Sequence, residues 1–123
     1  MNLFNLDKKV ALITGGNGGI GYAMAKAMGD AGANIIIAGR NKNKNILSEN
    51  KLKNSNIDAM SIEVDVDDEL SCQNMVNQVV DKFQKIDILE DEVSRLRSIK
   101  RVMSKKFENI QIAKVIQVDV IPN

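Results

Sequence analysis

The chain has 123 residues, of which 44% are apolar and 27% charged, and its net charge is +1 at pH 7. This composition is that of a globular domain, and a chain of this length can bury about two thirds of its unfolded surface. A net charge near zero excludes global attraction to nucleic acid or to a membrane surface. The single cysteine excludes an intrachain disulfide, and the lack of histidine removes the commonest metal ligand and general base.

The sequence also lacks the marks of a targeted or membrane-spanning protein. Its apolar runs are shorter than the roughly 18 residues that a membrane helix needs. Residues 1–9 carry charges and no apolar core of the kind found in secretion signals. We therefore expect a cytoplasmic protein that binds neither membrane nor nucleic acid.

The first predicted elements form a βαβ unit. Residues 10–13 are continuously apolar, which is typical of a strand buried on both faces of a parallel sheet. Residues 16–21 then fit G-x-G-x-x-G, and a helix over 22–31 and a strand over 35–38 follow. In such a unit the glycines let a pyrophosphate approach the backbone at a helix N-terminus. This context favours dinucleotide binding over a purely structural turn.

The end of the second strand predicts which dinucleotide is bound. A residue there contacts the adenosine ribose and is acidic for NAD or basic for NADP. This chain has Gly39 and Arg40, with Lys42 and Lys44 nearby. The planar guanidinium of Arg40 can pair with a 2′-phosphate. We expect NADP to be favoured over NAD; the alternative is that Arg40 is a solvated loop residue.

The next segments predict the rest of a half sheet. Residues 41–54 give a weak helical pattern, 59–66 alternate as a strand, 69–85 form a strongly amphipathic helix, and 86–89 form a fourth strand. Four strands with right-handed crossovers predict an α/β fold, a partial Rossmann or doubly wound parallel sheet in the order 3-2-1-4.

An acidic run surrounds the start of the amphipathic helix. Asp67, Asp68 and Glu69 can cap that helix and complement its dipole. We expect no metal site, because no converging ligands are evident elsewhere in the sequence. Cys72 lies on the apolar stripe of the helix, which predicts a packed side chain rather than a nucleophile.

The motif Thr14-Gly15-x-x-x-Gly19-Ile20-Gly21 resembles the fingerprint of the short-chain dehydrogenase/reductase family. The similarity extends over residues 6–89 and is greatest to the branch of sugar-acid (2-deoxy-gluconate dehydrogenase-like) and 3-oxoacyl reductases. It implies that the side chain of Asp65 and the backbone of Val66 meet the adenine ring. The cofactor-binding residues predicted by the motif and the resemblance are Thr14, Gly15, Asn17, Gly18, Gly19, Ile20, Gly21, Arg40, Asp65 and Val66.

The catalytic residues that the resemblance implies are not assigned. The family uses a tyrosine, a lysine four residues later and a serine. Tyr22 and Lys26 have the tyrosine–lysine spacing, but they follow the glycine loop directly and so lie at the diphosphate end. The resemblance also implies that residue 123 falls near the middle of a family member, before the fifth strand.

Residues 90–123 depart from the family pattern. Residues 90–94 place bulk and three carboxylates where the family has small residues beside the nicotinamide ribose. A helix is predicted from residue 91 or 92 to 107, with a charge pattern that complements its dipole and no aromatic interleaving to indicate nucleic-acid binding. Residues 107–121 favour a strand over the long helix of the family. We therefore divide the chain into a Rossmann half, 1–89, and a divergent tail of the same domain, 90–123.

These patterns predict a truncated or remodelled NAD(P)-dependent short-chain oxidoreductase that retains its dinucleotide loop and is inactive alone. The alternative is a non-enzymatic nucleotide-binding or interaction module that completes its sheet as a homo-oligomer. A third interpretation is a gene fragment that does not fold stably. The substrate is not specified by the sequence.

Overall fold

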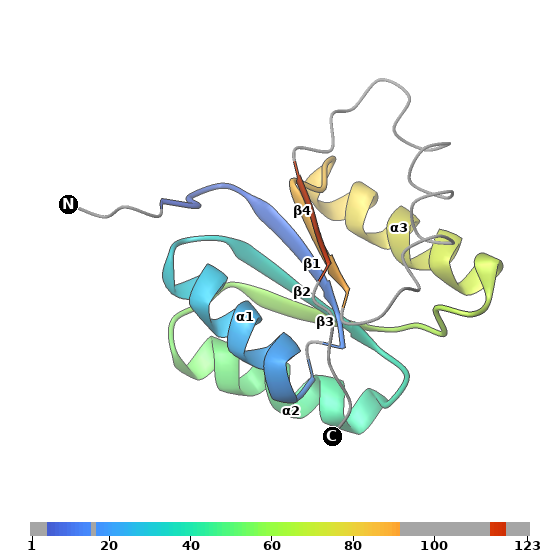
Figure 1. Ribbon diagram of the computed structural model, residues 1–123, viewed down its shortest axis with the longest axis horizontal. Helices are drawn as coiled ribbons and strands as arrows, with labels where there is room; N and C mark the ends of the chain where they lie inside the picture. Colours follow the sequence, from blue (N-terminus) through green and yellow to red (C-terminus); the bar gives the residue numbers. More distant parts are fainter. Residues whose placement is uncertain (1–4, 16, 92–113, 118–123) are drawn as a thin grey trace.

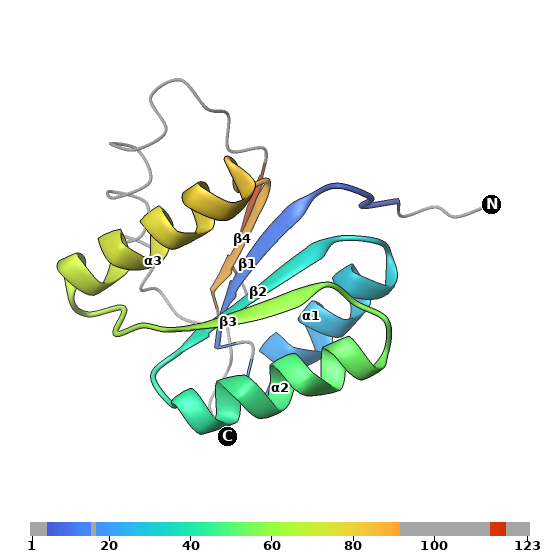
Figure 2. The same cartoon turned by 180° about the vertical axis from the view of Figure 1, so that it is seen from behind.

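The computed structural model describes residues 5–15, 17–91 and 114–117. Within this part of the chain a five-stranded parallel sheet has the order β3-β2-β1-β4-β5. Helices α1 and α2 cover one face of the sheet and α3 covers the other (Figures 1 and 2). The elements are β1 (Val10–Thr14), α1 (Gly19–Asp30), β2 (Asn34–Gly39), α2 (Lys42–Asn54), β3 (Ala59–Glu63), α3 (Glu69–Phe83), β4 (Ile88–Asp91) and β5 (Lys114–Gln117).

The predicted fold class and strand order are confirmed, and each face of the sheet has its own core. Because β1 pairs with β2 on one side and β4 on the other, all of its residues are buried. Successive side chains of β1 point to opposite faces of the sheet, so the strand contributes to both cores. The core under α3 includes Leu12, Ile36, Cys72, Met75, Val76 and Val79. The core under α1 and α2 includes Ala11, Ile13, Ala25, Ile35, Ile37 and Leu52.

The fourth strand begins two residues later than predicted. The carboxylate of Asp87 accepts a hydrogen bond from the backbone N–H of Val10 at 2.8 Å. The backbone N–H of Asp87 also donates to the carbonyl of Val10 at 2.9 Å, and the paired residues of the two strands begin with Ala11 opposite Ile88. The start of β4 is therefore set by its register with β1, which no local pattern reveals.

The expectation that the chain ends before a fifth strand is wrong. Residues 114–117 form β5, which pairs in parallel with β4 from Ile88 opposite Lys114 to Asp91 opposite Gln117. The strand preferred for the tail is thus confirmed over these residues, and it depends on pairing with β4. Asp91 ends β4 rather than starting a helix; the rest of the predicted helix, 92–107, lies outside the described residues.

Helix α2 covers almost all of the predicted range and is better defined than its weak pattern predicts. Asn41 caps it by accepting a hydrogen bond from the backbone N–H of Lys44 at 3.0 Å. Its buried side chains are Asn45, Ser48 and Leu52, which follow a helical spacing but are mostly polar. No helix in the described residues is long and apolar enough to cross a membrane.

Candidate dinucleotide-binding site

The predicted site residues gather at the carboxyl edge of the sheet. Thr14 ends β1, Arg40 follows β2 and Asp65 follows β3. These strands are parallel neighbours, so their carboxyl ends meet at one edge, beside the N-terminus of α1. In open parallel α/β sheets, ligands bind outside this edge.

The loop between β1 and α1 presents an open surface at a helix N-terminus. Gly19 has φ +58°, a left-handed conformation that favours glycine, and a Cβ at Gly18 or Gly19 would meet no heavy atom within 4 Å. Gly15 donates a backbone hydrogen bond to the carbonyl of Ala38 at 2.8 Å. The first turn of α1 contains no acidic residue. The loop therefore offers an anion open backbone at the positive end of a helix dipole, with no nearby acid in the first turn. Gly16 lies outside the described residues.

Two loop side chains have structural roles of their own. Thr14 is buried, and its hydroxyl donates to the backbone carbonyl of Glu90 at 3.3 Å, which ties β1 to β4. Ile20, in the first turn of α1, is 45% exposed and lies at the surface of the candidate site. Gly21 is buried against the interior.

A buried asparagine, missed in the sequence, holds the loop from α2. The side-chain amide of Asn17 donates to Oδ1 of Asn45 at 2.9 Å, and the amide of Asn45 donates to the carbonyl of Gly39 at 2.9 Å. We call Asn17, Asn45 and Gly39 the asparagine clasp. The signal that could have found it is the spacing of residues 45, 48 and 52, which places Asn45 on the inward face of α2.

Arg40 is an exposed residue held by two carboxylates. Its guanidinium lies 3.1 Å from Oδ1 of Asp65 and 3.3 Å from Oδ2 of Asp67, and its side chain is 64% exposed. Arg40, Asp65, Glu63 and Ser71 line a cleft of about 380 Å³ together with Val64. We call the region of Arg40, Asp65 and Asp67 the adenosine end of the candidate site. It carries two carboxylates beside its one guanidinium.

The acidic run otherwise serves α3. Asp68 caps the helix by accepting a hydrogen bond from the backbone N–H of Leu70 at 3.0 Å, as predicted, and Glu69 lies in the first turn. Among the described residues no three His, Cys, Asp or Glu side chains converge as metal ligands.

Cys72 lies beneath the adenosine end. It is fully buried, and its Sγ is 3.6 Å from the backbone carbonyl of Val66 and 3.9 Å from that of Asp65. Burial, reinforced by the carboxylates of Asp68 and Asp65, raises the pKa of the Cys72 thiol to about 11. A thiol in this state is a packing group rather than a nucleophile.

Tyr22 and Lys26 are engaged elsewhere on α1. Tyr22 packs against the core under α1 and α2, and its ring centroid lies 5.8 Å from the ammonium of Lys51. Lys26 forms an ion pair with Asp30 at 2.7 Å. Both side chains thus have structural partners, Tyr22 on α2 and Lys26 on α1.

Glu90 stands inside the sheet. It is fully buried in β4, opposite Ile13 of β1, and both of its carboxylate oxygens are inaccessible to solvent. The bulk predicted at the start of the divergent segment is therefore part of the interior at this position. Residues 92–94 lie outside the described part of the chain.

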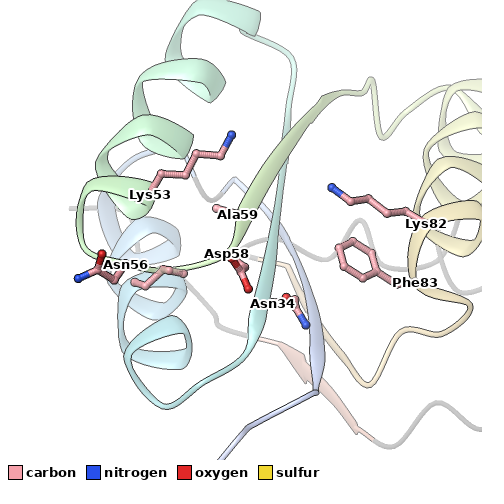
Figure 3. A pocket seen from close by; sticks show the side chains of 8 residues that line it. Asn34, Lys53, Asn56, Asp58, Ala59, Lys82 and Phe83 are labelled. Atoms are coloured by element: carbon pink, nitrogen blue, oxygen red, sulfur yellow. The ribbon is translucent and has the colours of Figure 1, made fainter.

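A larger cleft, of about 710 Å³, opens at the opposite edge of the sheet (Figure 3). Lys53 and Lys82 reach into it from the last turns of α2 and α3, above Asp58. Lys53 already pairs with Glu49 at 2.9 Å, and helix C-termini repel anions. Despite its size, this cleft is a poorer nucleotide site than the carboxyl edge.

Comparison with known proteins places these features in context. The profile described as short chain dehydrogenase matches residues 9–122. An uncharacterized oxidoreductase of Thermotoga maritima is 31% identical over 103 residues, covering 84% of this chain and 40% of the relative. The 2-dehydro-3-deoxy-D-gluconate 5-dehydrogenase of Formosa agariphila is 30% identical over 122 residues, covering 98% of this chain and 45% of that enzyme.

A solved structure agrees with these relatives. The Pseudomonas aeruginosa RhlG/NADP active-site complex matches with a TM-score of 0.68 and 26% identity, over 81% of this chain and 41% of that one. The chain thus spans less than half the length of each of these three proteins.

Proposed function

The chain belongs to the short-chain dehydrogenase family, and from this premise we propose that the loop between β1 and α1 binds the diphosphate of a nicotinamide dinucleotide. The proposal is supported mainly by the open face at Gly18 and Gly19, next to the first turn of α1, which has no acidic residue. A diphosphate needs both properties, because its oxygens must approach backbone N–H groups closely and without repulsion.

The proposal takes NADP as the favoured cofactor. Arg40 can exchange its carboxylate partners for a 2′-phosphate, since ion pairs between exposed side chains are individually weak. In this arrangement Asp65 and the backbone of Val66 lie beside the adenine ring. The RhlG structure contains NADP, which is in accord with this choice.

We further propose that the chain, taken alone, holds the cofactor without reducing a carbonyl. NADPH supplies a hydride when it is bound, but the transfer also needs a proton donor at the carbonyl oxygen. Tyr22 packs against the core under α1 and α2 and Lys26 pairs with Asp30, so we assign neither side chain this role. This describes a remodelled oxidoreductase, with residues 1–89 as the nucleotide-binding half and 90–123 as its divergent tail. On the sequence grounds given above, we assign it to the cytoplasm.

Isothermal titration of the folded chain with NADPH and NADH tests the proposal. Circular dichroism and urea unfolding establish that the protein is folded. We expect tighter binding of NADPH than of NADH, and no oxidation of NADPH when carbonyl compounds are added. A folded chain that binds neither nucleotide contradicts the binding proposal. Carbonyl-dependent oxidation contradicts the proposed inactivity and returns attention to Tyr22 and Lys26.

A further inference from the structure

We infer that Asn45 is a positioning residue for the glycine loop and, through it, for the bound diphosphate. Asn45 belongs to α2 and is 1% exposed. Its side chain joins three segments that are distant in sequence: it donates to the carbonyls of Gly39 in β2 and Ile62 in β3, at 2.9 and 3.3 Å, and accepts from Asn17 in the loop, at 2.9 Å. No motif of the family fingerprint includes it.

The hydrogen-bonding partners fix the orientation of both amides in the clasp. The carbonyls of Gly39 and Ile62 only accept hydrogen bonds, so Nδ2 of Asn45 must face them. Oδ1 of Asn45 is then directed at the loop, where it requires a donor, and Asn17 supplies one. A leucine or an aspartate at position 45 cannot satisfy all three contacts. The arrangement is specific to an asparagine at this position.

The loop needs such an anchor because of its own composition. Asn17 lies in a segment rich in glycine, with Gly15 at φ +73° and Gly19 at φ +58°. Glycine-rich backbone has many accessible conformations, and ordering them on binding weakens affinity. A buried side-chain hydrogen bond that holds the loop beforehand reduces that cost. The clasp therefore acts on the affinity for the diphosphate through Asn17, without Asn45 touching the ligand.

The clasp also explains why β2 ends in glycine. A Cβ at Gly39 would lie 2.7 Å from Nδ2 of Asn17 and 2.8 Å from Oδ1 of Asn45. Any side chain at this position would push the two amides apart. Since Gly39 directly precedes Arg40, the clasp links the loop to the segment that carries the adenosine end of the site.

The inference rests on the proposed function for its effect on nucleotide, and two variants test it. Asn17→Ala cuts the clasp at the loop and leaves the bonds of Asn45 to the sheet. Asn45→Leu keeps the buried bulk and removes all three bonds. We expect each variant to bind NADPH and NADH about tenfold more weakly, by the same factor for both, and the double variant to be no weaker than Asn45→Leu. Asn50→Leu, an exposed position on the same helix, is the matched control and should bind as the original chain does.

Hydrogen exchange of the ligand-free protein separates this inference from the proposed function. Cutting the clasp should accelerate exchange of the amides of residues 17–21 at least about tenfold, while the amides of β1 keep their rates. If Asn45 only stabilises the fold, its loss should lower the urea midpoint and accelerate amide exchange uniformly along the chain. Uniform acceleration, or unchanged exchange rates in residues 17–21, overturns the inference. If the loop accelerates but the original chain binds no nucleotide, the clasp stands and the proposed function fails. Unchanged affinity in both folded variants also overturns the positioning role.

Discussion

The two ends of the candidate site are built in opposite ways. At the diphosphate end, an acid-free helix turn and a glycine loop are held from below by the buried asparagine clasp. At the adenosine end, exposed Arg40 lies between Asp65 and Asp67. Buried hydrogen bonds fix shape, whereas exposed ion pairs are weak, screened by salt and easily rearranged. Under the proposed function, we expect affinity to depend on the first end and the choice between NADP and NAD on the second.

The largest effect should come from closing the open face of the loop. Gly19→Val places a β-branched side chain at φ +58° and fills the space above the start of α1. We expect binding of NADPH and NADH to fall at least about a hundredfold, or about 2.7 kcal/mol. Titration measures the loss, and circular dichroism checks that the variant is folded. Retained affinity in a folded variant would show that the loop is only a turn.

The next prediction concerns the interior below the adenosine end. With its pKa raised from 9.0 to about 11, the Cys72 thiol has about a hundredfold less thiolate at pH 8 than an ordinary cysteine. Iodoacetamide should therefore modify the native chain at least that much more slowly than the urea-unfolded chain. Because the sequence has one cysteine, mass spectrometry reads the rate directly. Rapid modification of Cys72 in the native chain would contradict its burial in a closed core beneath the adenosine end.

The raised pKa of Cys72 also predicts how the folding stability depends on pH. The pKa of the Cys72 thiol is higher in the folded than in the unfolded chain. The protonated thiol therefore contributes fully to the folding stability below the unfolded pKa of 9.0, and this contribution is lost as the pH rises toward about 11. The urea midpoint of the original chain should fall across that window more than that of Cys72→Ala. Parallel pH profiles would assign the loss to other groups.

A smaller effect, on selectivity, is expected at Arg40. Arg40→Asp removes the only basic group paired at the adenosine end of the described site and adds a carboxylate that can bind a ribose 2′-hydroxyl. NADPH should bind about tenfold more weakly and the preference should invert toward NADH. Lys44→Asp makes the same change of charge nearby and should leave the preference in place. Unchanged binding of both nucleotides by the Arg40 variant would remove Arg40 from the site.

The smallest effect is expected at Asp67, which competes with a 2′-phosphate for Arg40. Asp67→Asn should raise the affinity for NADPH, but not for NADH, by about two- to fivefold, the range of an exposed ion pair. The gain should shrink as ionic strength rises, because salt screens exposed charges. Asp81→Asn, an exposed acid on α3, serves as the control. An equal gain for both nucleotides would contradict a role in selectivity.

Much of this fold was predictable because its signals are local. The apolar run of β1, the glycine motif and the stripe of α3 each lie within one segment, and together they predict the strand order. The asparagine clasp and the Arg40 pairs were not predictable in the same way. Asn45 is a polar residue on the buried face of α2, where periodicity looks for apolar side chains. Asp65 and Asp67 lie 25 and 27 residues from Arg40, and only the pairing of β2 with β3 brings them together.

The central position of β1 also has a consequence for how the chain is made. Its partner β2 follows closely in sequence, but β4, its partner on the other side, ends at Asp91. At a synthesis rate of about 5–20 residues per second, roughly fifty residues separate the two partners by about 3–10 s. During that interval the edge of β1 that later pairs with β4 is exposed, and such an edge is the kind of surface that pairs with other chains. The emergence of β4 closes that edge.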